Sequence, residues 1–382
     1  MQWSIAFLLI VQVVFSFNIM DSLRPLSYLS LGLCFLGFSV MLPIRCRSLH
    51  FSIFELLNVL YFLLLFVFTL LNGTDLKTVL YKFVEIALLL MLISQFSHAM
   101  RTTIISFATA FSLAVYSNFL IMMMFPEWIM SFTGSEEDSF LLGGNYNQMG
   151  VRIICAITTN ILCVPYSRWW LLNTVALSMI GLATLLLVGS MTATSSLLVF
   201  FILTIFAKGK IFRASVIAFA FFILFFQLAV VFSGEGLHNN ELAVFIIEDV
   251  LGKDITFTNR TYLWDAAGRL FVESPIFGYG MPDVDWYYSH LSTLAIGPHN
   301  FIYNQMLMGG LILPIIIILM FIVAFRRCPV FSERNSQILT LSIVTIFFMM
   351  LMEVYSLFFV VYILSLIYFY PEISNSKSSL SE

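Results

Sequence analysis

The chain has 382 residues, of which 60% are hydrophobic and 10% are charged, and its formal net charge is −3. Its mean hydropathy of +0.99 exceeds what a soluble protein can bury, because interior volume grows too slowly with chain length. The charge balance also argues against a nucleic-acid partner. Apolar runs of membrane-spanning length recur throughout, which predicts an all-α polytopic membrane protein with residues 1–382 in a single integral membrane domain.

The interruptions between these runs predict about twelve transmembrane helices. The first run, Trp3 to Met20, lacks a basic start and a small-residue cleavage site, so we expect a retained helix. The last run, 337–370, is too long for one span and is divided at residues 353–356. The twelve expected ranges are 3–20, 26–44, 51–71, 78–97, 102–125, 147–165, 170–189, 193–207, 212–233, 300–325, 337–353 and 355–370.

The loops between these helices alternate in charge. Most basic residues fall on one side of the membrane, namely Arg45, Arg47, Arg101, Arg168, Lys208, Lys210, Arg213, Arg326, Arg327, Arg334 and Lys377. The other side receives Asp21, Asp75, Glu127, Glu136, Glu137, Asp138 and the long loop 234–299 between the ninth and tenth helices. Because basic residues accumulate in short cytoplasmic loops, we expect both termini in the cytoplasm and the large loop in the periplasm or outside the cell.

The sequence offers no ligand pattern for a metal or a cofactor. Its five cysteines have no CxxC spacing, and it contains no P-loop, Rossmann glycine pattern or HExxH. We therefore expect neither a metal nor a cofactor. A reaction on the outer face, away from ATP, must use a substrate that is already activated and that the membrane delivers.

The loop 234–299 is too long for a passive connector in a compact helical bundle. Residues 239–251 show helical spacing of apolar residues between polar ends, which predicts an amphipathic helix that lies at the membrane surface or simply packs. Residues 258–260 then offer N-cap chemistry for a second helix that runs to about Glu273.

The two arginines of this second helix face different directions. Arg260 and Trp264 are four residues apart and share a face, whereas Arg269 points to nearly the opposite side. Arg260 is therefore our candidate for a functional contact, with an ordinary solvated or salt-bridged arginine as the alternative. Arg269 is more typical of a surface or loop-anchoring residue, although it remains a candidate for substrate binding.

Two turns follow this helix. The glycines of Gly278-Tyr279-Gly280 permit positive φ angles and a close backbone approach. The second turn, Gly297-Pro298-His299-Asn300, opens the tenth helix and places His299 at its N-terminus on the outer face. The positive end of that helix favours a bound anion and disfavours imidazolium, and a neutral imidazole is what a general base requires. A helix cap or an interfacial hydrogen bond is the alternative role for His299.

Further polar residues enter the predicted spans. Asn147 belongs to a glycine- and asparagine-rich entry to the sixth helix, and Arg152 lies one to two turns inside the bilayer beyond it. An arginine at that depth usually faces a cavity or a partner. The same question applies to Glu55, Glu85 and Glu353, although Glu85 and Lys82 are spaced to form a pair.

The order of these motifs resembles the O-antigen polymerase and ligase superfamily. Arg260 and Trp264 come first, then Pro275-Ile276-Phe277-Gly278-Tyr279-Gly280, then His299-Asn300 and Gly310. The resemblance implies a metal-independent glycosyltransferase of the bacterial cytoplasmic (inner) membrane that acts on glycans linked to undecaprenyl diphosphate. It also implies that Arg260 binds the diphosphate and that His299 activates the acceptor hydroxyl. Attack of a hydroxyl activated in this way on the anomeric carbon predicts inversion at that centre.

The remaining candidates for substrate binding are Asn147, Arg152, Trp264, Tyr279, Asn300 and Arg269. The aromatic residues among them could stack on sugars or serve as interfacial anchors. One departure from the superfamily pattern is Met191, because many relatives carry an arginine at the corresponding outer junction. Arg152 is the residue best placed to supply the missing phosphate contact.

Three functions fit the sequence. A polymerase would join repeat units that remain lipid-linked, a ligase would move finished polymer to lipid A-core, and a transporter or flippase would carry lipid-linked glycans. The divergence near Met191 favours the polymerase, and the absence of a clear internal repeat disfavours the transporter. The expected partners are the lipid-linked oligosaccharide, membrane lipid and a chain-length regulator protein.

Overall fold

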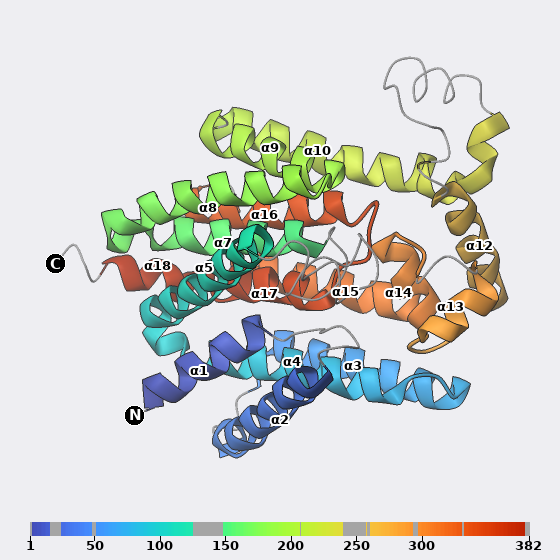
Figure 1. Ribbon diagram of the computed structural model, residues 1–382, viewed down its shortest axis with the longest axis horizontal. Coiled ribbons are helices and arrows are strands. Elements are labelled where there is room, and N and C mark those ends of the chain that lie inside the picture. The colour runs from blue at the N-terminus through green and yellow to red at the C-terminus, as the bar shows by residue number, and fades with distance from the viewer. Residues whose placement is uncertain are drawn as a thin grey trace.

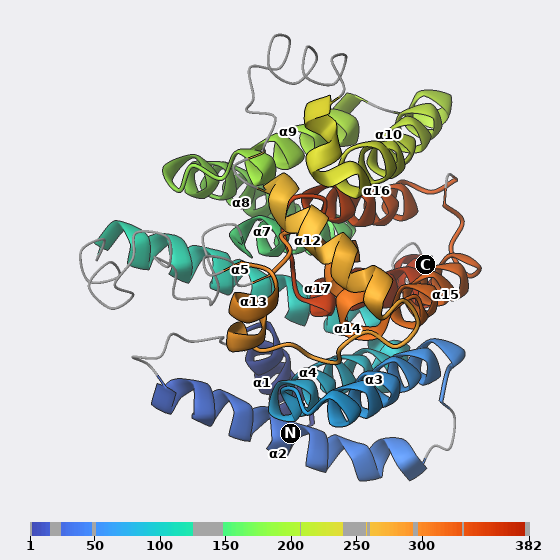
Figure 2. The ribbon, with the colours of Figure 1, turned by 90° about the vertical axis from the view of Figure 1, so that its right-hand side faces the viewer.

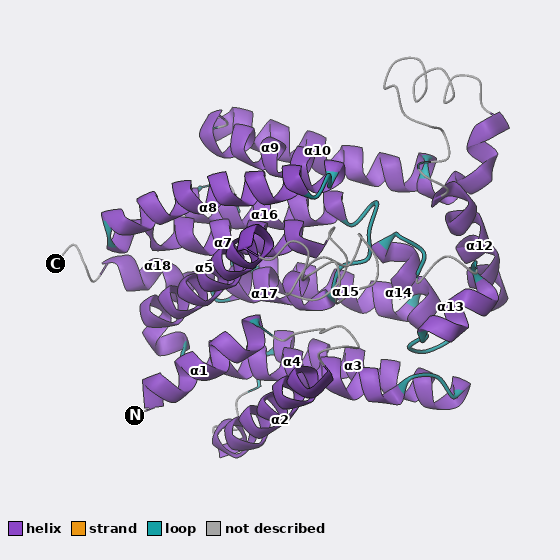
Figure 3. Ribbon diagram, viewed as in Figure 1, coloured by secondary structure: helices purple, strands orange, loops and turns teal. Residues whose placement is uncertain are grey.

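The computed structural model describes residues 2–15, 24–47, 51–124, 148–206, 208–239, 257, 260–292, 297–330 and 332–378. Within these residues the regular secondary structure consists of helices and contains no strand (Figure 3). The prediction of an all-α chain is confirmed for this part.

The α-helices are α1 (Gln2–Val14), α2 (Arg24–Arg47), α3 (Ile53–Asn72), α4 (Leu76–Gln95), α5 (Met100–Met124), α7 (Met149–Cys163), α8 (Arg168–Leu187), α9 (Met191–Phe206), α10 (Gly209–Ala229), α12 (Arg260–Glu273), α13 (Val284–His290), α14 (Phe301–Gly309), α15 (Ile312–Phe325), α16 (Arg334–Met349), α17 (Leu357–Tyr368) and α18 (Tyr370–Ser378). Three 3-10 helices, η2 (Ser97–Ala99), η5 (Val164–Tyr166) and η6 (Val231–Asn239), extend or join them.

Each of the twelve predicted ranges contains a helix. The tenth differs from the expectation, because Gly310 at φ 55° breaks it into α14 and α15. Among the described residues, six helical stretches are long and apolar enough to cross a membrane, and they lie in α2, α3, η2–α5, α7–η5, α8 and α10–η6. Shorter apolar helices occur in α1, α9, α15 and α17, so the full set of twelve spans stays a prediction.

Most helices run side by side, roughly along the long axis of the molecule (Figure 1). The α3–α4 hairpin packs against α15 and α17, α7 packs between α5 and α8, and α16 packs against α9. The start of α1 and the helix α18 lie at the same end of the bundle. Helices α12 and α13 lie across the opposite end, where Figure 2 views the molecule end-on.

The loop 234–299 therefore has structure of its own. Its helix α12 matches the expected range, and it packs with α13 and α14 in a small apolar cluster around Trp264, Tyr287 and Leu307. The predicted surface helix 239–251 lies outside the described residues apart from its first residue, Asn239, which ends η6. This end of the bundle carries the candidate site.

One of the three intramembrane glutamates has a structural explanation. Glu55 forms a capping box with Ser52 at the start of α3, and its carboxylate lies 2.8 Å from the guanidinium of Arg45. Both side chains are buried, so each charge compensates the other. Glu55 thus joins α2 to α3.

Candidate active site

The glycine turn 278–280 binds the C-terminal end of α14 through its backbone. The amide of Tyr279 donates to Leu307 O at 2.7 Å, and the amide of Gly280 donates to Met308 O at 3.0 Å. Gly278 has φ 61°, and a Cβ there would lie 2.5 Å from Leu307 O. The predicted positive φ and close backbone approach are confirmed, and their reason is this contact between two backbones.

The same turn also binds the α3–α4 hairpin. The amide of Met281 donates to Thr69 Oγ1 at 2.9 Å, and the amide of Asp75 donates to Met281 O at 3.1 Å. Gly280 has φ 77°, and a Cβ there would lie 2.4 Å from Thr69 Cα. The segment 278–281 therefore fixes α14 relative to α3 and α4, and all three helices contribute residues to the lining of one cavity.

His299 is held at the mouth of α14 by a strained backbone. Its φ of 46° lies in the left-handed region, which a histidine rarely adopts unless its surroundings impose it. The next residue, Asn300, is the N-cap of α14 and accepts from the Tyr303 amide at 2.9 Å. The predicted position of His299 at a helix N-terminus is confirmed.

Asn300, the residue after His299, is fully buried. Its amide group donates to Gln227 Oε1 at 2.9 Å and to Leu351 O at 3.0 Å, so it joins α14 to α10 and to the loop 350–356 between α16 and α17. The polar atoms of its side chain are hydrogen-bonded to other residues of the protein, and no part of the side chain is exposed to solvent. The structure gives Asn300 a positioning role.

His299 forms a pair with Glu353, which projects from the loop 350–356. Nδ1 of the imidazole lies 3.2 Å from one carboxylate oxygen, Oε1. The guanidinium of Arg260, at the first residue of α12, lies 4.0 Å from the other oxygen, Oε2. Three segments that are distant in the sequence thus meet at one carboxylate.

The carboxylate of Glu353 is an anion in this arrangement. Burial opposes its ionisation, but the hydrogen bond and charge of His299, with the more distant Arg260, outweigh that effect. Together they hold the pKa of the Glu353 carboxyl below its ordinary value of 4.5. The expectation from the sequence considered only the positive end of α14. The structure adds a carboxylate at 3.2 Å from the imidazole Nδ1.

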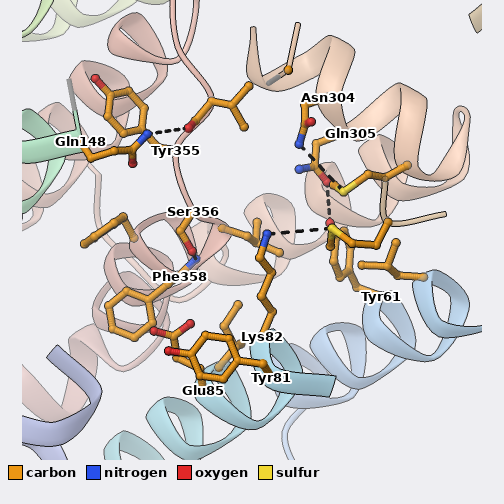
Figure 4. A pocket seen from close by; sticks show the side chains of 18 of the residues that line it. Tyr61, Tyr81, Lys82, Glu85, Gln148, Asn304, Gln305, Tyr355, Ser356 and Phe358 are labelled. Atoms are coloured by element: carbon orange, nitrogen blue, oxygen red, sulfur yellow. Dashed lines mark hydrogen bonds between the residues drawn. The ribbon is translucent and has the colours of Figure 1, made fainter. Parts of the chain in front are cut away.

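His299 and Glu353 line a cavity of about 280 Å³ that extends inward between α3, α4, α7 and α17. Arg152 of α7 lines the same cavity, as do Lys82 and Glu85 of α4. Figure 4 shows Lys82 pointing into this space, with Glu85 and Tyr81 beside it. The other polar lining residues are Tyr61, Gln148, Asn304, Gln305, Tyr355 and Ser356.

The remaining expected site residues lie elsewhere. Trp264 is fully buried in the cluster of α12 to α14, where no ring face is open to a sugar. Tyr279 donates to Leu270 O at 2.9 Å and packs against Trp286. Arg269 is exposed and ion-paired with Asp265 one turn earlier, on the side away from the buried face of α12. Asn147 lies outside the described residues.

Met191 stands where many members of the superfamily carry an arginine, and the structure shows where it lies. Met191 begins α9 with 68% of its surface exposed, and it does not line the cavity. Arg152 does line it, and its guanidinium lies 5.6 Å from the ring centroid of Phe359. The cavity therefore receives an arginine from α7, whereas the start of α9 supplies none.

Three charged cavity residues, Lys82, Glu85 and Glu353, were not among the expected site residues. Glu353 interrupts the apolar run 337–370, and an ionisable residue at such a break is itself a reason to expect a site. Lys82 was interpreted as a helix partner of Glu85 because of their spacing, which does not reveal that both face a cavity. Within the described residues, no group of three or more His, Cys, Asp or Glu side chains is arranged to hold a metal ion.

The described residues form an apolar helical bundle, and the His299–Glu353 pair with Arg260 beside it lies at the end that carries α12 and α13. Comparison with protein families is more specific. Residues 176–318, from α8 into α15, match the family model described as O-antigen ligase. This match confirms the resemblance of the motifs to the O-antigen polymerase/ligase superfamily, whose members are glycosyltransferase-like enzymes. No curated protein and no solved structure matches the chain.

Proposed function

We propose that this protein is an O-antigen or capsular polysaccharide polymerase that joins repeat units linked to undecaprenyl diphosphate. The observation that carries the proposal is the His299–Glu353 pair at the mouth of a cavity that also receives Arg152. A base held by a carboxylate next to a cationic pocket suits the transfer of a sugar from a diphosphate leaving group.

The geometry supports an inverting displacement. Glu353 accepts a hydrogen bond from Nδ1–H of His299, which leaves Nε2 as the ring nitrogen with the lone pair. Nε2 removes the proton of the acceptor hydroxyl as its oxygen bonds to the anomeric carbon of the donor. The bond from that carbon to the diphosphate oxygen breaks, and the diphosphate leaves with the electron pair. Glu353 stabilises the imidazolium that results.

The leaving diphosphate needs positive charge close to the base. Arg260 is 23% exposed in its side chain and lies beside Glu353 at 4.0 Å, a distance that leaves its planar guanidinium able to bind phosphate oxygens. Arg152 supplies a second cation from α7. In this proposal Arg260 and Arg152 contact the diphosphate, while Asn300 positions His299.

An apolar groove supports a lipid-linked substrate. It has a volume of about 440 Å³ and lies between α10 and α15, with α14 and α16 as its floor. Gln305 of α14 lines both the groove and the catalytic cavity, so the two adjoin. A polyprenyl chain in the groove would bring its diphosphate to the cavity. The outer, lipid-facing side of α10 and α15 is also apolar, as an occupant from the bilayer requires.

The arrangement of helices supports the orientation expected from the charges. The start of α1 and α18 lie at the end of the bundle opposite α12 and α13. We propose that the termini face the cytoplasm of a bacterium and that the site opens at the outer face of its inner membrane. A chain-length regulator protein would act on this same face.

A ligase is the second candidate, because the matching family model is described as O-antigen ligase. Deleting the gene and separating the surface polysaccharide on a gel distinguishes the two. A polymerase deletion leaves a product with a single repeat, whereas a ligase deletion leaves full-length polymer on the carrier lipid. Repeat units that accumulate on the cytoplasmic side would indicate a flippase and contradict both.

Variants of the site test the residue roles in the complemented deletion strain. His299→Ala and Arg260→Ala should each give the single-repeat pattern at normal protein level. Wild-type ladders from both would remove the basis for the site assignment. If Arg152→Lys and Arg152→Ala both retain long polymer, then Arg152 does not contact the phosphate.

A further inference from the structure

Two successive amide side chains of α14 line the cavity that holds the His299–Glu353 pair. Asn304 lies one turn after the N-cap, with its backbone amide donating to Asn300 O at 3.0 Å, and Gln305 follows it. Figure 4 shows both side chains extending from α14 toward the space that they line. Neither group takes part in the proposed displacement.

A tyrosine hydroxyl holds the oxygen of each amide. Tyr61 of α3 donates to Gln305 Oε1 at 2.5 Å, and Tyr287 of α13 donates to Asn304 Oδ1 at 2.7 Å. Both tyrosines are buried, so their hydroxyls depend on these partners. Because an amide carries its oxygen on one side and its NH2 group on the other, the two hydrogen bonds leave the NH2 groups as the ends that can serve a ligand.

These NH2 groups have few acceptors inside the protein. Gln305 is 3% exposed, and within the described part of the chain its Nε2 forms no hydrogen bond. Among the same residues, Nδ2 of Asn304 contacts only the sulfur of Met308 at 3.9 Å, and a thioether is a weak acceptor. A buried donor without a partner is unfavourable. Water can satisfy it in the empty cavity, but a substrate that displaces this water must supply acceptors of its own.

We propose that Asn304 and Gln305 are specificity-determining residues that donate hydrogen bonds to an uncharged oxygen acceptor on the sugar nearest to the carrier lipid. This inference rests on the proposed function and names the part of the substrate that the two amides recognise. Neutral amide donors suit a hydroxyl or acylamino oxygen, whereas charged donors serve a phosphate or carboxylate better. Because both amide oxygens are held by tyrosines, a substituent that can only donate finds no partner here.

The surroundings of the two amides fit a sugar close to the lipid. Met308 of α14 and Leu65 of α3, each about one turn after one of the hydrogen-bonded residues, also line the cavity. An apolar wall with a few placed polar groups is the usual way to bind and orient a neutral ligand. Gln305 also lines the apolar groove proposed for the lipid chain, so an acceptor at this junction belongs to the first sugar after the diphosphate.

The test compares lipid-linked repeat units that differ by one oxygen in the sugar nearest to the carrier. The purified full-length protein in nanodiscs is given the natural repeat unit, analogues in which one hydroxyl of that sugar is replaced by hydrogen, and an analogue without the acyl group if the sugar carries an acylamino group. We expect one analogue to have a kcat/KM lower by roughly tenfold, because a hydrogen bond to the amides is lost. The replaced group identifies the acceptor as a hydroxyl or an acylamino oxygen. Equal kcat/KM for all analogues overturns the proposal.

Gln305→Met connects that loss to the amide donor. Methionine has nearly the same length and no N–H group, so kcat/KM for the natural repeat unit should fall by roughly tenfold. The analogue that the wild type uses poorly should cost this variant no further loss, because the contact is already absent. The same result is expected for Asn304→Leu. The proposal is overturned if either variant keeps the wild-type kcat/KM, or if the losses from variant and analogue are additive.

Tyr61→Phe separates a substrate contact from a structural role. It breaks the same hydrogen bond between α3 and α14 as Gln305→Met but keeps the Nε2 donor, so it should lose less activity. Tyr116→Phe is the matched control, because Tyr116 donates to Asn173 Oδ1 at 2.7 Å, does not line the cavity and should leave kcat/KM unchanged. Elution as a single species and a cooperative melting transition show that each variant is folded. Equal losses for Tyr61→Phe and Gln305→Met would make the contact between the helices the cause and overturn the proposal.

Binding of the natural lipid-linked repeat unit in the same nanodiscs separates this inference from the proposed function. The affinity should fall by roughly tenfold in Gln305→Met. If it does while the deletion strain makes normal polymer, the proposed function fails and the sugar contact stands. If the deletion strain makes single repeats while Gln305→Met binds and uses the repeat unit as the wild type does, the sugar contact fails and the proposed function stands.

Discussion

Nδ1 of His299 lies 3.2 Å from Oε1 of Glu353, although the two residues are 54 positions apart and belong to different loops. Between them lies Asn300, which caps α14 next to His299 and also donates to Leu351 O in the loop that carries Glu353. One buried asparagine thus positions both members of the pair. The pair is the centre of the proposed active site.

Replacing the carboxylate should abolish most of the transfer. Glu353→Gln keeps the shape of the side chain but removes the charge that stabilises imidazolium, so we expect a rate loss of roughly a hundredfold or more. The measurement is polymer formation from lipid-linked repeat units by the purified protein. Glu372→Gln, which removes a carboxylate paired with Arg327 at 3.0 Å, is the control and should leave the rate unchanged. Equal rates for the two variants would contradict the role of Glu353.

Ionisation of the Glu353 carboxyl should also make the stability of the folded protein depend on pH. Because the interaction with His299 lowers the pKa of Glu353 from 4.5, ionisation of this group stabilises the folded protein above pH 4.5, and the stabilisation is lost as the pH falls through the lowered value. The melting temperature of the wild type should therefore exceed that of Glu353→Gln above pH 4.5 and approach it in more acidic buffer. If the difference in melting temperature between the wild type and Glu353→Gln grows as the pH falls, the pKa of Glu353 is raised and not lowered, which contradicts the prediction.

The two arginines of α12 offer a matched comparison. Arg260→Ala should reduce polymer formation by roughly tenfold or more, because a charge-assisted contact to phosphate is lost. Arg269→Ala removes an exposed ion pair with Asp265 and should stay close to the wild type in both activity and stability. The measurement is the length of the polysaccharide ladder on a gel, compared between strains that contain equal amounts of each variant protein. Similar losses for both would mean that α12 is needed only as a whole.

The glycine turn should be sensitive for a structural reason. Gly278→Ala combines a positive φ with a Cβ only 2.5 Å from Leu307 O, and we expect a loss of about 1–3 kcal/mol of stability. Gly236→Ala is the control, because a Cβ there meets nothing within 4 Å. Melting temperatures in detergent measure the difference. If Gly278→Ala has the same melting temperature as the wild type, the backbone of residue 278 does not approach Leu307 O as closely as described.

Filling the apolar groove should impair the use of lipid-linked substrate. Ile318 lines the groove and Ile315 does not, yet both are on α15 and are similarly exposed, at 58% and 52%. Ile318→Trp should raise the substrate concentration needed for half-maximal polymerisation, because the indole occupies space meant for the lipid chain. Ile315→Trp should have little effect. Equal behaviour of the two variants would place the lipid chain elsewhere.

Much of the helical layout was predictable from the sequence, and some of its breaks were not. Apolar run length predicted where α16 and α17 separate, since the run 337–370 is too long for one span. The break at Gly310 was missed because the adjacent glycines Gly309 and Gly310 lie inside an apolar run that is long enough for one continuous helix. Only the contact of Gly310 with Ile276, where a Cβ would lie 2.2 Å from the carbonyl carbon, explains the break.

The sequence by itself determined the class of structure, the helix ranges and the positions of Arg260 and His299, because hydropathy, helical phase and turn chemistry are local properties of the chain. The tertiary structure decided which of these residues meet. It brought Glu353 to His299, buried Trp264 and Asn300 as supports, and directed Lys82 and Arg152 into one cavity. Such contacts depend on how distant helices pack, and the spacing within one helix carries no information about the neighbour that it will face.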